Sequence, residues 1–305
     1  MINPFKEIYE KDEMRNPYDH ELVRFPLLLD VEATNFCNLS CIMCPRQIMK
    51  RGLGYMDFNL FIKIVDEAAK EGCMGIRIIR FGEPLLHPEI IDMIKYVKKA
   101  GLKAHITTNG LLLDSNKAGE LLSAGLDSII FSFQGTDRSE YQKMRSNDSY
   151  EILENNIKNL VKMRNDAKAK LHIQVTTTVL DESEEQIKKF NEKWERIVDR
   201  VDHWYTSLLR LENTNVSKEL FKRQRIKERM HRGRCNEVLT KMSIDWDGRV
   251  TACCGDFNCE LYVGDAKKES LKQIWNGERY KKLRELLEKG EREKVPFCKL
   301  CTSKF

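Results

Sequence analysis

Three cysteines stand close together in the segment ATNFCNLSCIMCPR, at positions 37, 41 and 44. Three thiolates at this spacing can hold three of the irons of a [4Fe–4S] cluster, because each iron takes a sulfur ligand from the protein. The fourth iron is then open to a small molecule. Three cysteines with a distant fourth ligand can also bind zinc, so a zinc site is the alternative. Cys37, Cys41 and Cys44 are therefore predicted to be metal ligands.

A second group of cysteines lies in the C-terminal third of the chain. Cys235, Cys253, Cys298 and Cys301 form the pattern C-x12-G-x4-C followed by C-x2-C, in which the glycine is Gly248. Four thiolates complete the ligand set of a cluster, and such a closed cluster transfers electrons or contacts a substrate. A four-cysteine zinc ribbon uses the same ligands and is the alternative.

The first 210 residues or so resemble the radical S-adenosylmethionine (SAM) superfamily. The resemblance rests on the CxxxCxxC spacing after an initial strand and on the segment Phe81–Pro84, which is similar to the Gly-Gly-Glu-Pro segment of the family. It implies that the open iron binds SAM and that an electron cleaves SAM to a 5′-deoxyadenosyl radical. Phe81 stands where the family usually has glycine, and Met43 where it usually has an aromatic residue. The SAM contacts that the resemblance implies are Gly82, Glu83, Pro84, Thr108, Ser132, Gln134 and Arg145.

The C-terminal cysteine pattern resembles the auxiliary-cluster extension of SPASM and twitch proteins. The longer SPASM form has further cysteines after the last pair, whereas this sequence ends at Phe305. We therefore expect one auxiliary [4Fe–4S] cluster besides the SAM-binding [4Fe–4S] cluster.

Three cysteines remain outside the two groups. Cys254 directly follows the predicted ligand Cys253, so its side chain points differently. One hypothesis makes Cys254 catalytic, as a thiol that returns a hydrogen atom to a substrate radical, as in radical SAM epimerases. An alternative ligand or a packing role is the other. Cys73 is predicted to be a buried small hydrophobe, and Cys259 has no assigned role.

The resemblance also bears on the substrate. Peptide-modifying SPASM enzymes usually carry a further recognition domain or the longer cluster domain, and we expect neither in this chain. A sugar or aminocyclitol, free or carrier-linked, is therefore expected to lose a hydrogen from a carbinol carbon and to be epimerised or oxidised. An electron donor such as flavodoxin or ferredoxin would be a partner. The alternatives are a maturase that modifies a peptide or protein, and a non-catalytic iron–sulfur scaffold.

Composition limits the remaining possibilities. The net charge of +5 among 99 charged residues implies no general affinity for polyanions. A local basic stretch could contact a phosphate or RNA, but a solvated helix face is the simpler interpretation, so nucleic acid is not expected as a partner. No apolar run is long enough to span a membrane and no export signal is visible, so we expect a cytoplasmic protein. The basic stretch comprises Lys218, Lys222, Arg223, Arg225, Lys227, Arg229, Arg232 and Arg234.

Short apolar runs alternate with amphipathic stretches, which predicts an α/β fold. Six such β/α units favour a partial (β/α)6 barrel, with function at the carboxyl ends of the strands. Residues 1–215 are predicted to form this core, with the first 25 as an extension, and residues 216–305 a small auxiliary-cluster domain. That domain would have a basic helix, a strand pair at 241–253 turned by Asp247-Gly248, and a final helix at 271–287. Strands are predicted at 27–32, 74–80, 103–108, 128–133, 171–179 and 203–208, with helices at 59–70, 88–100, 150–164 and 184–196.

Overall fold

A computed structural model describes residues 1–14, 25–205, 220, 235, 237–299 and 301. The basic stretch between positions 218 and 234 lies outside the described residues, and so does the basic helix predicted there. In the part that is described, no helix is long and apolar enough to cross a membrane.

Nine described strands form one sheet in the order β6-β5-β4-β3-β2-β1-β7-β8-β9. Neighbouring strands from β6 to β7 pair in parallel, and β8 and β9 continue the sheet in antiparallel pairing. The carboxyl ends of β1 to β6 therefore meet at one edge. The strands are Leu28–Val31, Gly75–Ile78, Lys103–Thr108, Ser128–Ser132, His172–Val179, Arg200–Tyr205, Lys241–Ile244, Arg249–Thr251 and Tyr262–Asp265, numbered β1 to β9.

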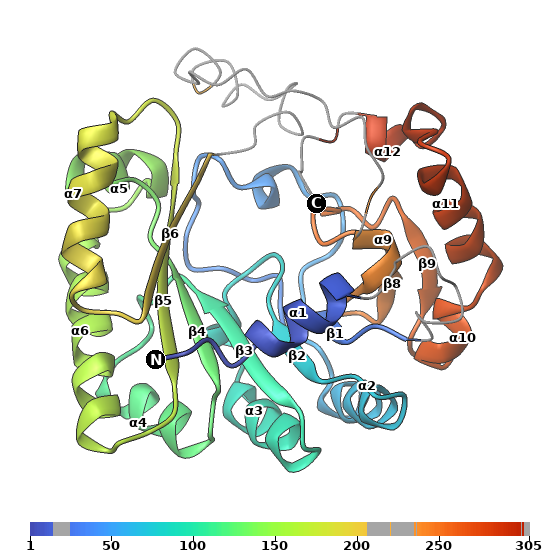
Figure 1. Cartoon of the computed structure of the whole chain (residues 1–305), viewed down its shortest axis with the longest axis horizontal. Helices are drawn as coiled ribbons and strands as arrows, with labels where there is room; N and C mark the ends of the chain where they lie inside the picture. Colours follow the sequence, from blue (N-terminus) through green and yellow to red (C-terminus); the bar gives the residue numbers. More distant parts are fainter. Residues whose placement is uncertain (15–24, 206–219, 221–234, 236, 300, 302–305) are drawn as a thin grey trace.

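Helices between the parallel strands cover the outer side of the curved sheet, and α10 and α11 lie beyond β9 (Figure 1). Helix α2 illustrates why they pack there: Asp57 caps its N-terminus, and its apolar side chains recur every three or four residues and face the core. The helices are α1 Lys6–Met14, α2 Phe58–Lys70, α3 Ile90–Lys99, α4 Ser115–Ser123, α5 Arg138–Arg145, α6 Tyr150–Asp166, α7 Glu184–Glu195, α9 Glu237–Thr240, α10 Leu271–Trp275, α11 Glu278–Glu288 and α12 Pro296–Lys299.

The predicted partial barrel of six β/α units is confirmed, and most predicted elements agree with the structure to within a few residues. Strand β6 begins at Arg200, three residues before the predicted start, and positions 206–208 of the predicted strand lie outside the described residues. The single final helix predicted at 271–287 is wrong. Gly277 separates α10 from α11, because it serves as the N-cap of the second helix.

The C-terminal strands extend the sheet of the N-terminal part. Strand β7 pairs with β1 along its whole length, from Leu28 opposite Lys241 to Val31 opposite Ile244. The predicted hairpin is confirmed: β7 and β8 are antiparallel, and Gly248 makes the turn with a φ of +89°. The auxiliary region is thus attached to the first strand of the barrel, next to the loop that carries the first three cysteines.

Candidate active site

A cavity of about 460 Å³ lies at the carboxyl ends of β1 to β4. Cys37, Cys41 and Cys44 line it, and Cys254 of the auxiliary region lines it as well. The fold therefore brings the three clustered cysteines and the strand-end residues to one place. All seven residues predicted to contact SAM are among its lining residues: Gly82, Glu83, Pro84, Thr108, Ser132, Gln134 and Arg145.

Two side chains before Cys37 close the loop that carries the three cysteines. The Thr34 hydroxyl donates to the Gly54 carbonyl at 2.7 Å. The Asn35 amide donates to the Gly52 carbonyl at 2.8 Å and accepts from the Gly54 amide at 2.9 Å. Both side chains are buried, so these bonds join the start of the cysteine loop to its end and limit its conformations.

Gly82 is required at its position by the close approach of the cysteine loop. Its φ is +114°, and a Cβ there would lie 2.3 Å from the Thr34 carbonyl oxygen and 2.8 Å from that of Phe36. The Glu83 amide donates to the same Phe36 carbonyl at 2.8 Å. The turn after β2 is therefore packed backbone to backbone against the residues before Cys37.

The Glu83 carboxylate binds groups of the protein itself. It accepts from the Thr108 hydroxyl at 2.6 Å, from the Asn109 amide at 2.7 Å and from the Leu85 amide at 3.1 Å. Burial raises the pKa of Glu83, while these donors and Arg145 oppose the rise. The carboxylate thus joins the ends of β2 and β3, and one oxygen accepts only a single bond.

Two polar side chains approach the sulfur atoms of the first cysteine group. The side-chain amide nitrogen of Asn109 lies 3.9 Å from the Cys37 sulfur, and the Arg145 Nη1 lies 3.5 Å from the Cys41 sulfur. Arg145 is 4% exposed and also donates to the Phe133 carbonyl, but its Nη2 has no partner in the described part of the chain. A buried guanidinium with a free donor beside this cavity is suited to an anionic ligand group.

Gln134 closes the cavity at the end of β4. It has a φ of +68°, and its side-chain carbonyl accepts from the Thr178 hydroxyl of β5. This places Gln134 in the wall of the cavity next to Ser132, where the resemblance implied that both would lie.

The second cysteine group surrounds a smaller cavity. Cys235, Cys253, Cys298 and Cys301 all line it, although they come from three separate segments. Burial raises the pKa of Cys235 and raises that of Cys298 to about 12, and in the first group it raises the pKa of Cys44 to about 11. Metal binding to these thiols would therefore release protons.

In the described residues, no three His, Cys, Asp or Glu side chains form a group that could hold a single metal ion. In a four-iron cluster each thiol binds a different iron, so the thiols need not converge on one point. Soft, buried thiols with few competing oxygen ligands suit iron–sulfur clusters.

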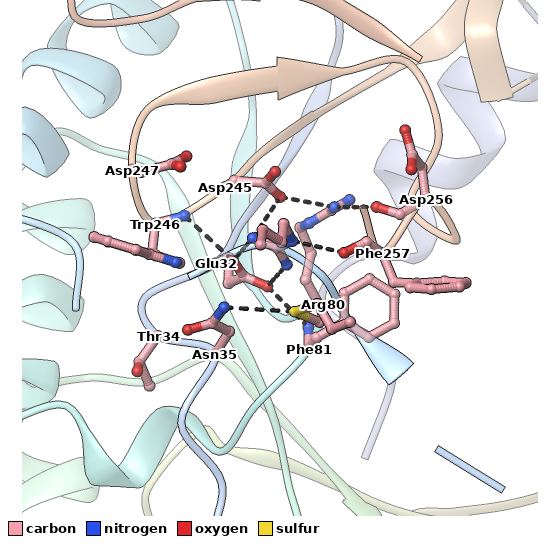
Figure 2. Close-up of polar contacts among 12 residues, drawn as sticks. Glu32, Thr34, Asn35, Arg80, Phe81, Asp245, Trp246, Asp247, Asp256 and Phe257 are labelled. Atoms are coloured by element: carbon pink, nitrogen blue, oxygen red, sulfur yellow. Dashed lines mark hydrogen bonds and ion pairs between the residues drawn. The ribbon is translucent and has the colours of Figure 1, made fainter. Parts of the chain in front are cut away.

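A buried cluster of four charges consists of Glu32, Arg51, Arg80 and Asp245, and Arg80 also lines the large cavity. Figure 2 labels Glu32, Arg80 and Asp245 of this cluster. Arg51 binds Glu32 through two hydrogen bonds of 2.6 Å, and Arg80 binds Asp245 at 2.8 Å. Burial alone would lower the pKa of Arg80, but Asp245 and Glu32 outweigh it and the pKa is raised. Burial raises the pKa of Asp245 to about 6. Each arginine of the cluster is thus paired with a carboxylate.

Cys73 and Cys259 line neither of the two cavities. Cys73 is buried and donates to backbone carbonyls, which confirms the structural role predicted for it. Cys259 is buried but lines neither cavity. Sequence reasoning gave no role to Arg80, and noted Asn109 only as part of the segment that ends the third strand; both also line the large cavity. A charged residue at the end of a buried strand was the available signal for Arg80.

Two family models match the chain. Residues 31–203 match the radical SAM superfamily, and residues 235–302 match SPASM, an iron–sulfur cluster-binding domain.

Curated relatives match part of the chain. A tungsten-containing aldehyde ferredoxin oxidoreductase cofactor-modifying protein of Pyrococcus furiosus is 35% identical over 156 residues, which are 49% of this chain and 43% of that protein. The PqqA peptide cyclase of Gluconobacter oxydans is 31% identical over 110 residues, which are 36% of this chain and 30% of that protein. The chain therefore spans less than half the length of these relatives.

Solved structures resemble the chain over most of its length. BtrN in complex with AdoMet and 2-DOIA matches with a TM-score of 0.63 and 19% identity, over 92% of this chain and 94% of that chain. Streptococcus suis SuiB bound to its precursor peptide SuiA matches with a TM-score of 0.67 and 20% identity, over 93% of this chain and 72% of that chain. At these identities the likeness shows a shared fold.

Proposed function

Because this chain belongs to the radical SAM superfamily, with SAM, a [4Fe–4S] cluster and an auxiliary iron–sulfur site as its cofactors, we propose that the large cavity is where it cleaves SAM and starts radical chemistry on a substrate. The observation that carries the proposal is the shared lining of that cavity. Cys37, Cys41 and Cys44 meet there with the predicted SAM contacts from the ends of β2, β3 and β4.

When bound, the cluster supplies the electron that cleaves SAM to a 5′-deoxyadenosyl radical. The residues of the chain bind and orient. Cys37, Cys41 and Cys44 hold the cluster, and the free Nη2 of Arg145 binds the carboxylate of SAM. Gly82 lines the cavity and would offer backbone groups to SAM, while Ser132 would offer a hydroxyl to the ribose. Cys235, Cys253, Cys298 and Cys301 hold the auxiliary cluster.

A peptide or protein is the substrate class that we propose first. It is supported by the curated relative named as a peptide cyclase and by the likeness to SuiB bound to a precursor peptide. The reaction is then the removal of a hydrogen atom from a carbon of the peptide, followed by bond formation, oxidation or hydrogen return. A reductant such as flavodoxin or ferredoxin would supply the electron.

A small molecule is the second candidate. The match to BtrN spans nearly the whole of both chains, and that structure holds the small ligand 2-DOIA. This supports a sugar or aminocyclitol whose carbinol carbon loses hydrogen, the substrate class expected from the sequence. The two classes are distinguished by incubating the reduced enzyme with SAM and either peptides encoded near its gene or a panel of sugars and aminocyclitols. Mass spectrometry of each mixture identifies the substrate, because only a substrate changes in mass.

The proposed chemistry is tested on anaerobically reconstituted protein. Wild type should contain about eight irons per chain, four for each cluster, and should form 5′-deoxyadenosine when reduced. A variant with Cys37→Ala, Cys41→Ala and Cys44→Ala should keep about four irons and lose cleavage. Zinc in place of iron, or cleavage that survives in the variant, would overturn the proposal.

A further inference from the structure

Two arginines from the barrel hold one turn of the auxiliary region by its backbone. Arg80 donates to the carbonyls of Asp256 at 2.8 Å, Cys253 at 3.3 Å and Cys254 at 3.4 Å. Arg51 donates to the next carbonyl, that of Phe257, at 2.7 Å. Four carbonyls within five consecutive residues therefore accept from barrel side chains.

These side chains are held firmly. The Arg80 and Asp245 side chains are fully buried, and those of Arg51 and Glu32 are at most 1% exposed. Each arginine also binds a carboxylate, so the charges of the four-charge cluster balance and neither guanidinium is free to turn toward another partner. Figure 2 shows Glu32, Arg80 and Asp245 of this cluster, with Asp256 and Phe257 beside them.

Arg80 lines the large cavity. Arg80 has a φ of +113°, a backbone conformation that residues other than glycine rarely adopt. It stands between the end of β2 and Gly82, whose backbone packs on the cysteine loop. Arg80 thus lies two residues before the predicted SAM contact Gly82, and its side chain binds the turn that carries Cys253 and Cys254. Strained backbone of this kind persists where the surrounding structure fixes it, as at functional sites.

We propose that Arg80 is a positioning residue that fixes the Cys253–Asp256 turn, and with it the auxiliary cluster ligand Cys253 and the thiol of Cys254, relative to the SAM cavity. The positioning of the turn is argued from the contacts above. The expected consequence, that cleavage of SAM stays coupled to product formation, rests on the proposed function. Misplacing reacting groups by about 1 Å costs up to about 100-fold in rate.

The matched pair Arg80→Lys and Arg77→Lys tests the proposal. Arg77 lies on β2, is mostly buried and binds Asp30 through two hydrogen bonds of 2.6 and 2.9 Å, but it makes no bond to the turn. Lysine keeps the charge at both positions and loses the planar fork, so it cannot bind a carboxylate and three carbonyls at once. Both variants therefore retain the charge balance and differ in their contact with the turn.

The first readout needs no activity. Both substitutions are placed in the Cys37→Ala, Cys41→Ala, Cys44→Ala background, which retains the auxiliary cluster alone, and its electron paramagnetic resonance spectrum and midpoint potential are measured. Arg80→Lys should change the spectrum and potential, or lose this iron, whereas Arg77→Lys should leave them as in the background. Equal effects of the two variants, or no effect of Arg80→Lys, would overturn the proposal.

The second readout is the amount of product formed per SAM cleaved in the otherwise wild-type enzyme. Arg80→Lys should lower this ratio about tenfold or more while cleavage continues, and Arg77→Lys should not. An unchanged ratio in Arg80→Lys would overturn the coupling role. If wild type cleaves no SAM, the proposed function fails, and the spectroscopic comparison still decides whether Arg80 positions the turn.

Discussion

Cys253 and Cys254 are consecutive residues whose side chains line different cavities, Cys253 that of the four-cysteine group and Cys254 the large cavity. The pKa of the Cys254 thiol is raised well above its usual value, first by a hydrogen bond with Cys253 and then by burial. Cys254 therefore lines the cavity in which the proposed substrate radical would form. The turn that separates the two side chains is the one held by Arg80.

The substitution Cys254→Ala tests the hydrogen-donor hypothesis. We expect about eight irons and normal SAM cleavage, because Cys254 stands outside the four-cysteine group. Return of hydrogen to the substrate should be lost, measured in D2O as the loss of solvent deuterium from the product. Cys259→Ala, in a buried thiol outside both cavities, is the control and should behave as wild type. A loss of about four irons in Cys254→Ala would make it a ligand and contradict the hypothesis.

The substitution Gly82→Ala should destabilise the protein and impair SAM binding. A Cβ at Gly82 would lie 2.3 Å from the Thr34 carbonyl oxygen, and alanine would be strained at the φ of +114° that Gly82 has. Strain and overpacking together cost about 2 to 5 kcal/mol. Urea unfolding of the reconstituted proteins measures the loss. Gly52→Ala is the control, since a Cβ there meets no atom within 4 Å. Equal stability of the two variants would show that the close packing is not needed.

Local spacing was enough to predict much of the site. The two cysteine groups follow from short spacing patterns, whereas the SAM contacts, Ser132 and Arg145 among them, were implied by the resemblance to the radical SAM superfamily. Parallel strands put their carboxyl ends at one edge, which explains why these residues line one cavity. The barrel could be predicted from the alternation of strand and helix patterns, because the spacing of apolar residues indicates which face of each strand or helix is buried.

Contacts between distant segments could not be predicted in this way. Glu32 and Asp245 are 213 positions apart, and neither belongs to a sequence pattern that indicates which residue it binds. Glu83 lines the cavity in which it was expected to contact SAM, but the sequence did not predict that its carboxylate also binds Thr108, Asn109 and Leu85, the nearest donors to a buried acid. The break at Gly277 was missed since one glycine within an amphipathic stretch often leaves a helix intact.

The substitution Arg145→Lys should weaken SAM binding and leave both clusters in place. Arg145 offers a free Nη2 in the large cavity, and lysine cannot reach both this position and the Phe133 carbonyl. Loss of one charge-assisted hydrogen bond corresponds to an increase in Kd of about 10-fold or more. Calorimetric titration of reconstituted enzyme with SAM measures the change. The control is Arg164→Lys, in a buried arginine that binds Asp199 away from the cavity, and it should keep the wild-type Kd. An unchanged Kd in Arg145→Lys would remove Arg145 from the SAM site.

The free energy of unfolding should fall with decreasing pH because of His105. Burial, and to a smaller extent Arg77, lowers the pKa of His105 from 6.5 to about 3 in the folded protein. The imidazole is packed against the Phe5 ring and contacts Thr107, so it stays neutral when the unfolded chain takes up a proton. Below about pH 6.5 the unfolded state therefore binds one more proton, and acid favours unfolding.

Between pH 7 and pH 5, this one group should reduce the free energy of unfolding by about 2 kcal/mol. Urea unfolding at several pH values in this range measures the slope. His105→Phe keeps a ring against Phe5 and removes the titrating group, so its slope should be smaller by that amount whatever its absolute stability. Because the comparison uses the difference between two slopes, other titrating groups cancel. Identical slopes in the two proteins would mean that His105 gains a proton in the folded state as readily as in the unfolded state, against its burial beside the Phe5 ring.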